Sequence, residues 1–180
     1  MADDTQQIRS AEVPLERDLF MRKLLRELTG TLENVVGMED AAGYVSTVGA
    51  AMGQWIDEQY RSALSVENLN PAQVAQVFVD LKGRIGGDFF IVSLDEDKIV
   101  VGNRSCPFGD MAHDRPSLCM MTSNVFGRIA ADNLGYARVE LQDTIAQQGD
   151  ECRIVVHLKP RDDVPADARE YYRTSSGPAG

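Results

Sequence analysis

The strongest constraint on the fold is the alternation of apolar and polar residues in two short segments near the C-terminus. Residues 136–142 (YARVELQ) and 152–159 (CRIVVHLK) each place every second residue on one apolar side. A period of two is that of a β-strand with one buried face. The turn residues Gln148-Gly149-Asp150 lie between the two segments. The chain is therefore predicted to contain an antiparallel sheet with one face against a core.

A second hairpin is predicted upstream of the first. Residues 89–94 (FFIVSL) and 98–103 (KIVVGN) are apolar and rich in β-branched and aromatic residues, and Asp95-Glu96-Asp97 joins them as a loop. Between the two hairpins, a helix is predicted from Pro116 to about residue 134, where Gly135 ends it. The sheet is thus expected to have four strands, with one helix inserted between its hairpins.

Three helices are predicted to precede the sheet. Apolar residues recur at helical spacing over residues 15–35 and 39–62. The third helix has the clearest start, since Asn70 is a good N-cap, Pro71 stands at the first helical position and Gln73 can complete a capping box. The fold class is therefore α+β, with N-terminal helices followed by the antiparallel sheet.

The second predicted helix carries a stripe of small residues, Ala42, Ser46, Gly49 and Gly53, beside its apolar stripe. Glycine inside a helix is unfavourable by up to about 1 kcal/mol relative to alanine. Such a stripe indicates that another backbone approaches closely. Two interpretations are open: tight contact within the chain, or a helix-to-helix contact in a homodimer.

Composition predicts one domain between two polar ends. The chain has 180 residues, of which 1–13 and 160–180 are rich in charge, Pro, Gly and Ser and are predicted to be disordered. Residues 14–159 are expected to form a single sensory or regulatory domain, because no composition shift marks a second one.

Charge and cysteine usage exclude several function classes. The net charge of −10 disfavours direct binding to nucleic acid or to an anionic membrane surface. No run of about 18 apolar residues is present, and the polar N-terminus has no signal-peptide pattern. Three cysteines without a secretory context do not form a disulfide framework. We therefore expect a cytoplasmic protein with no membrane contact.

The cysteine spacing is the most informative local feature. Twelve residues separate Cys106, which leaves a strand, from Cys119, which enters a helix. A thiol in the first turn of a helix is expected to have a lowered pKa. Cys152 begins the last predicted strand on its core-facing side. We expect the three thiols to meet at one corner of the sheet.

His113 lies in the loop between the first two cysteines and is the candidate for a fourth ligand. Together with the thiols it would give a Cys3His site for zinc or an iron–sulfur cluster. No Cys-x-x-Cys pair is present, and buried cysteines often act only as small apolar residues. Three interpretations therefore stay open: structural thiols, a metal or cluster site, and a redox-active thiol pair.

The chain has the motif Cys-Pro-Phe, then Arg-Pro-Ser-Leu-Cys, then a helix ending in Leu-Gly, followed by a strand, Gly-Asp-Glu-Cys-Arg and a final apolar strand. This pattern resembles the methanogen output domain family. More loosely, it is similar to 4-vinyl reductase-like small-molecule-binding domains and to the sensing region of iron–sulfur-binding winged-helix repressors. Those repressors supply a fourth thiolate, whereas this chain has three cysteines and no DNA-binding module.

The resemblance implies a non-catalytic domain that senses a ligand, a redox state or a metal. By resemblance, Cys106, Cys119 and Cys152 are the positions that would bind the cofactor. The signal would pass to a signalling or transcription-regulatory protein partner.

Two other function classes compete with the sensor. The chain has no nucleophile elbow, phosphate loop, dinucleotide fingerprint or His-Glu-x-x-His motif, so a small reductase or hydrolase-like enzyme ranks second. A structural dimeric adaptor is the third class, and it gains support from the small-residue stripe and the acidic composition.

Overall fold

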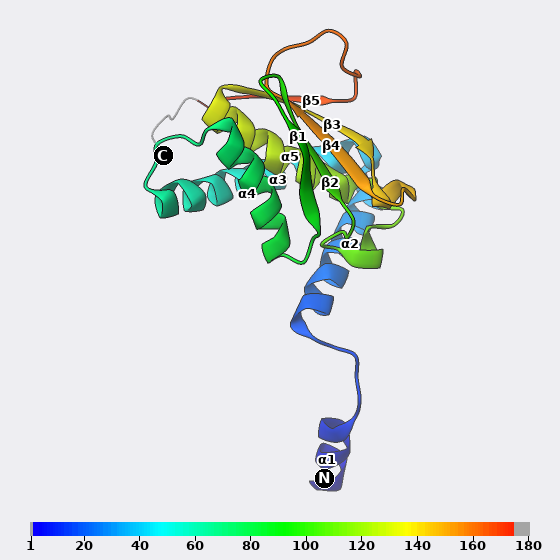
Figure 1. Ribbon diagram of the computed structural model, residues 1–180. Helices are drawn as coiled ribbons and strands as arrows, with labels where there is room; N and C mark the ends of the chain where they lie inside the picture. The colour runs from blue at the N-terminus through cyan, green and yellow to red at the C-terminus, as the bar shows by residue number, and fades with distance from the viewer. Residues whose placement is uncertain (1, 175–180) are drawn as a thin grey trace, which may run out of the picture.

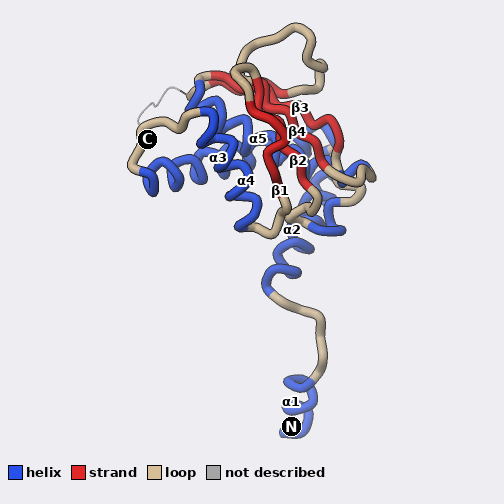
Figure 2. Tube along the Cα trace, in the orientation of Figure 1, coloured by secondary structure: helices blue, strands red, loops and turns tan. Residues whose placement is uncertain are grey.

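The computed structural model describes residues 2–174. Its elements, in chain order, are α1 (Ala2–Ser10), α2 (Arg17–Val36), α3 (Met38–Leu64), α4 (Pro71–Arg84), β1 (Phe89–Leu94), β2 (Lys98–Asn103), η1 (Gly109–Ala112), α5 (Pro116–Leu134), β3 (Tyr136–Asp143), η2 (Ile145–Gln147), β4 (Cys152–His157) and β5 (Arg169–Tyr172). Helices α2, α3, α4 and α5 gather on one side of the sheet (Figures 1 and 2). The predicted α+β class, both hairpins and the helix between them are confirmed.

The sheet has five strands rather than the predicted four, in the order β1-β2-β4-β3-β5, and every pairing is antiparallel. The fifth strand, β5, comes from the segment that was predicted to be a disordered tail. It is held because Tyr171 enters the interior beside Gly127, and the Tyr171 and Ser123 hydroxyl oxygens lie 3.1 Å apart. The strand β5 has four residues, of which only Arg169 and Tyr171 are partly buried. It is too short for its alternation to be recognised in the sequence.

The core lies between the sheet and helices α4 and α5. The rings of Phe78 and Phe126 stack with centroids 4.1 Å apart, and Phe89 meets Phe126 edge-on at 5.9 Å. The predicted capping box is present at the start of α4. The Asn70 side chain accepts a hydrogen bond from the Gln73 amide, and the Gln73 side chain accepts one from the Asn70 amide.

The small-residue stripe of α3 packs within the chain. A Cβ atom added at Gly49 would lie 2.8 Å from Asn124 Cβ, and one added at Gly53 would lie 2.8 Å from Arg128 Cβ. Both partners belong to α5. Of the two interpretations, tight contact within the chain is therefore correct, and this stripe does not provide a dimer contact.

The apolar stripes of α2 and α3 are exposed instead. On α3, Tyr44 is 59% exposed, Val48 52%, Met52 38% and Trp55 55%. On α2, the exposed large apolar residues are Phe20, Met21, Leu24, Leu28 and Val35. Because the glycine side of α3 gives the closest approach to α5, the larger side chains are turned outward.

Both polar ends contain regular structure. Residues 2–10 form helix α1 instead of the predicted disordered segment, and α1 stands away from the sheet and its helices in Figure 1. At the other end, residues 161–168 loop back to β5, and the Arg138 side chain donates hydrogen bonds to the carbonyl oxygens of Arg161, Val164 and Pro165. Residues 1 and 175–180 of the predicted ends lie outside the described part of the chain.

Candidate functional site

The three cysteines line one small cavity at the end of the sheet, which we call the thiol cavity. Its volume is about 30 Å³. Its apolar lining comes from Phe89, Pro107, Phe108, Ala112, Leu118, Leu141 and Ile154, and its polar lining from Asn103, Thr122, Thr144, Cys106, Cys119 and Cys152. The fold thus brings thiols from three separate segments to one place, as the spacing of the cysteines predicted.

Strand pairing fixes the position of Cys152. It is the first residue of β4 and lies opposite Asn103, the last residue of β2. The Asn103 amide nitrogen is 3.7 Å from the Cys152 sulfur, and the backbone amide of Ile145 donates to the same sulfur at 3.4 Å. This thiol is therefore oriented by two donors.

Turns and the start of α5 position the other two thiols. Cys106 follows β2, and the backbone amides of Phe108 and Gly109 point toward its sulfur. Cys119 lies in the first turn of α5, where the Thr144 hydroxyl is its hydrogen-bonding neighbour. All three sulfurs are partly buried and carry no disulfide.

The pKa of Cys119 is raised to about 12, mainly by burial and to a smaller extent by the nearby Cys152 and Cys106. Burial also raises the pKa of Cys106. The expectation of a lowered pKa at Cys119 is therefore wrong, because removing the thiolate from water outweighs the field of the helix terminus. Both thiols are protonated at neutral pH.

Neither histidine lines the thiol cavity. His113 is exposed, and its backbone carbonyl oxygen accepts a hydrogen bond from Arg26. His157 is buried on β4, where its Nε2 atom lies 3.2 Å from a carboxylate oxygen of Glu140. Among residues 2–174, no three His, Cys, Asp or Glu side chains are arranged to hold a metal ion. The predicted fourth ligand, His113, is thus outside the site.

Lys82 is a site residue that the sequence analysis missed. It lies near the end of α4, is only 5% exposed, and its ammonium donates to the Thr122 hydroxyl at 2.8 Å. The ammonium lies 5.3 Å from the centroid of the Phe89 ring and 5.4 Å from that of Phe126. Thr122 and Phe89 line the thiol cavity, so the positive charge lies directly behind the cavity wall.

The electrostatics of Lys82 follow from its burial, which lowers its pKa to about 8. The acids that act on it are the thiols of Cys106, Cys119 and Cys152, which would raise its pKa if ionised. Lys82 lies at helical spacing from Ala75 and Phe78, which are both buried. This spacing was the signal in the sequence that could have identified Lys82. A lysine at that spacing belongs to the buried face of α4.

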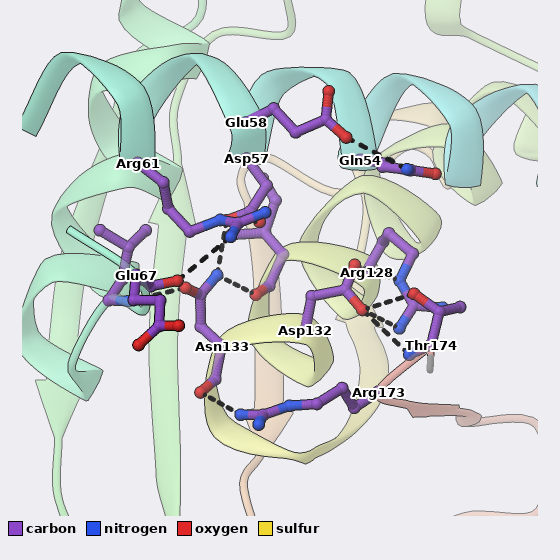
Figure 3. A network of polar contacts seen from close by, with 12 residues as sticks. Gln54, Asp57, Glu58, Arg61, Glu67, Arg128, Asp132, Asn133, Arg173 and Thr174 are labelled. Atoms are coloured by element: carbon purple, nitrogen blue, oxygen red, sulfur yellow. Dashed lines mark hydrogen bonds and ion pairs between the residues drawn. The ribbon is translucent and has the colours of Figure 1, made fainter. Parts of the chain in front are cut away.

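A second buried polar cluster lies on α3 and α5 (Figure 3), and none of its residues lines the thiol cavity. Asp57 is 1% exposed; it accepts hydrogen bonds from Arg61 at 2.8 Å and from Asn133 at 2.5 Å. Burial raises the pKa of Asp57, and the hydrogen bond from Asn133 and the charge of Arg61 lower it again. Arg173 donates to the Asn133 carbonyl oxygen at 2.7 Å, which ties the chain after β5 to α5.

The class defined by the fold is that of α+β domains in which helices cover one face of an antiparallel sheet. Within that class, the sequence matches the model of the methanogen output domain 1 family over residues 24–157. That match spans more than half of the chain, so the chain belongs to this family. A search of the curated protein sequences finds no match.

The fold is shared with solved structures, including the following two. The phenol-responsive sensory domain of the transcription activator PoxR, solved with phenol, is 15% identical, with a TM-score of 0.60, covering 81% of this chain and 76% of its own. A trafficking protein particle complex subunit 3 from Naegleria fowleri, covalently bound to palmitic acid, is 13% identical, with a TM-score of 0.53, covering 86% of this chain and 99% of its own. In the described residues, no helix has the length and apolar character needed to cross a membrane.

Proposed function

We propose that this chain is a non-catalytic sensory domain that receives a small ligand at the thiol cavity and passes the signal to a protein partner. The observation that carries the proposal is the convergence of Cys106, Cys119 and Cys152 on one cavity with Lys82 behind its wall. The fold shared with the PoxR sensory domain, which holds phenol, supports a ligand-sensing role.

A small molecule fits this cavity better than a bound metal. Among residues 2–174, no group of three His, Cys, Asp or Glu side chains is arranged to hold a metal ion. Zinc or an iron–sulfur cluster needs thiolates at bonding distance. The described arrangement does not fit either one as it stands.

The same chemistry favours sensing over catalysis. A cysteine nucleophile requires a thiolate or an adjacent base. The pKa of Cys119 is about 12, and neither histidine lines the cavity. We therefore propose that the thiols contribute shape, polarity and a response to ligand rather than a reaction.

Thermal unfolding with added effectors tests this function. The full chain, purified anaerobically and checked for metal by elemental analysis, is unfolded alone, with phenol, with short carboxylic acids and with zinc. A ligand that binds the native state raises Tm by mass action. We expect at least one organic effector to raise Tm in the wild type and not in a Cys106→Ser/Cys119→Ser/Cys152→Ser variant. No shift with any organic effector, or an equal shift in the variant, would contradict the proposal.

We also propose that the sensor is a homodimer joined through the exposed apolar face of α2 and α3. From Ala41 to Ile56 the chain contains no charged residue, although its net charge is −10. Copies of an acidic chain repel each other except where their surfaces are uncharged, so this face fits a second copy. Tyr44, Val48, Met52 and Trp55 would form the centre of a self-complementary contact.

Light scattering over a dilution series tests the dimer. Val48→Glu places a charge at the centre of the proposed contact and is expected to give a monomer. Val92→Glu is the matched control, since Val92 is 43% exposed on the edge strand β1. A wild-type chain that is monomeric at all concentrations, or a dimer that survives Val48→Glu, would overturn this arrangement.

A further inference from the structure

Resting on the proposed ligand-sensing function, we propose that the ligand of the thiol cavity is a small organic monoanion of the carboxylate class, and that Lys82 is the residue that recognises its charge. Three features of the structure support this assignment: the place of the ammonium, its lack of a counter-ion, and the size and polarity of the cavity.

The ammonium of Lys82 adjoins the cavity through one hydrogen bond. Its Nζ atom donates to the hydroxyl of Thr122, which lines the cavity, at 2.8 Å. An ammonium carries three N–H donors, and this is the one hydrogen bond that Nζ makes among the described residues. The faces of Phe89 and Phe126 flank it at 5.3 and 5.4 Å from their centroids. Reorientation of Thr122 would bring a ligand oxygen within reach of the same charge.

Within residues 2–174, no carboxylate lies within 4.0 Å of the Lys82 ammonium. The acids that face it are thiols on three elements: Cys106 after β2, Cys119 on α5 and Cys152 on β4. Burial raises the pKa of Cys106 and Cys119, so these two thiols do not neutralise the ammonium at neutral pH. Buried charges in proteins are nearly always paired. A ligand anion would supply the balancing charge.

The cavity sets the size of that anion. A single water needs roughly 10–15 Å³ measured in this way, and the thiol cavity has about 30 Å³. The space suits a group of a few non-hydrogen atoms, as in formate or acetate. The surrounding Phe108, Leu118 and Ile154 favour a ligand whose remaining surface is apolar.

Matched pairs of probes separate charge from shape. Acetate and acetamide, and formate and formamide, are nearly the same size and differ in charge. Each is titrated into the full chain labelled with ¹⁵N, and the backbone signals of Asn103, Cys119 and Thr122 report on the cavity. The variants are Lys82→Met and, as control for the loss of one positive charge, Lys23→Met, since Lys23 is exposed on α2.

We expect the wild type and Lys23→Met to bind the carboxylates about tenfold or more tightly than the amides, because hydrogen bonds to charged groups are the stronger ones. We expect this preference to disappear in Lys82→Met. In the wild type, carboxylate affinity should fall as the pH rises through about 8, where Lys82 loses its proton. The wild-type pH series keeps the test valid if the variant folds poorly.

Several outcomes would overturn the assignment. Equal binding of acid and amide at the cavity would leave the sensory function standing and refute the role of charge. A carboxylate preference that survives in Lys82→Met would refute the role of Lys82. If none of the probes shifts the cavity signals, this ligand class is refuted, whereas the sensory function is decided separately by the Tm shifts of the wild type and the cysteine variant.

Discussion

Two buried charged side chains in this domain differ in whether they have a partner of opposite charge. Asp57, 1% exposed, is paired with Arg61 and accepts a hydrogen bond from Asn133 (Figure 3). Lys82, 5% exposed, has a neutral hydroxyl as its hydrogen-bond partner and two aromatic rings beside it. The first charge lies where α3 meets α5, and the second lies behind the thiol cavity.

This difference separates a structural cluster from the proposed sensing site. A buried charge that is paired and hydrogen-bonded fixes the elements around it, and loss of one partner is strongly destabilising. A buried charge without a counter-ion weakens the fold, and such residues are found at functional sites. The two clusters should therefore respond to neutralisation in opposite directions.

The largest effect is expected at the paired charge. Asp57→Ala removes one hydrogen-bond acceptor from the Asn133 amide and one from the Arg61 guanidinium, and we expect the free energy of unfolding to fall by about 3 kcal/mol. Urea unfolding of the full chain measures this loss. Asp18→Ala is the control, because Asp18 pairs with Arg22 one turn along α2 and is exposed, and such surface pairs contribute about 0–1 kcal/mol. Equal losses in the two variants would show that the Asp57 cluster is not structural.

Removal of the unpaired charge, that of Lys82, is expected to stabilise the domain rather than destabilise it. Burial lowers the pKa of Lys82 from 10.5 to about 8, which corresponds to roughly 3 kcal/mol of destabilisation while the amine is protonated. Lys82→Met removes this charge and keeps most of the apolar stem. We expect it to stabilise the domain by about 1–3 kcal/mol at pH 7 in urea unfolding. A loss of stability would place Lys82 with Asp57 as a structural residue.

The pH dependence sharpens the same contrast. Between about pH 8 and 10.5 the unfolded chain holds a proton on Lys82 that the folded chain has released, so stability should rise with pH in this window. The buried thiols act in the opposite direction above pH 9, because their raised pKa values let the unfolded chain lose protons first. Subtracting the curve of Lys82→Met removes the thiol contribution. The free energy of unfolding of Lys82→Met minus that of the wild type should fall toward zero as the pH rises from 8 to 10.5. A constant difference would contradict the lowered pKa of Lys82.

A smaller effect is expected from the glycine contact beside the Asp57 cluster. Alanine at position 53 would place Cβ 2.8 Å from Arg128 Cβ and 3.1 Å from the Val125 carbonyl oxygen. Overfilling such a contact is destabilising by about 1–3 kcal/mol. Gly43→Ala is the matched control on the same helix: a Cβ there meets nothing within 4 Å, so it should stabilise the helix by up to about 1 kcal/mol. Thermal unfolding compares the two variants. Equal Tm values would mean that α3 and α5 are less closely packed at Gly53 than the structure shows.

Much of this fold was predictable because it depends on local signals. Both hairpins, the capping box at Asn70 and the helix from Pro116 to Leu134 lie where the sequence placed them. The convergence of the three cysteines also followed from local signals, because each one stands at the end of a predicted element. The methanogen output domain resemblance is likewise confirmed.

The remaining features depend on tertiary contacts that period and spacing do not encode. Which stripe of α3 is buried was decided by the close approach of α5 at Gly49 and Gly53. The pKa of Cys119 was decided by burial rather than by the helix terminus. Lys82 was overlooked because a single lysine on a buried helix face is normally expected to reach solvent through its flexible stem.

The most direct test of the unpaired charge is the titration of Lys82 itself. The chain has four lysines, so the ¹³Cε signals of Lys82, Lys23, Lys98 and Lys159 can be resolved and assigned with Lys82→Met. We predict a titration midpoint for Lys82 near 8, which rises when acetate saturates the thiol cavity. A midpoint near the ordinary value of 10.5, unchanged by acetate, would contradict the claim that Lys82 is an unpaired charge behind the thiols that binds the ligand anion.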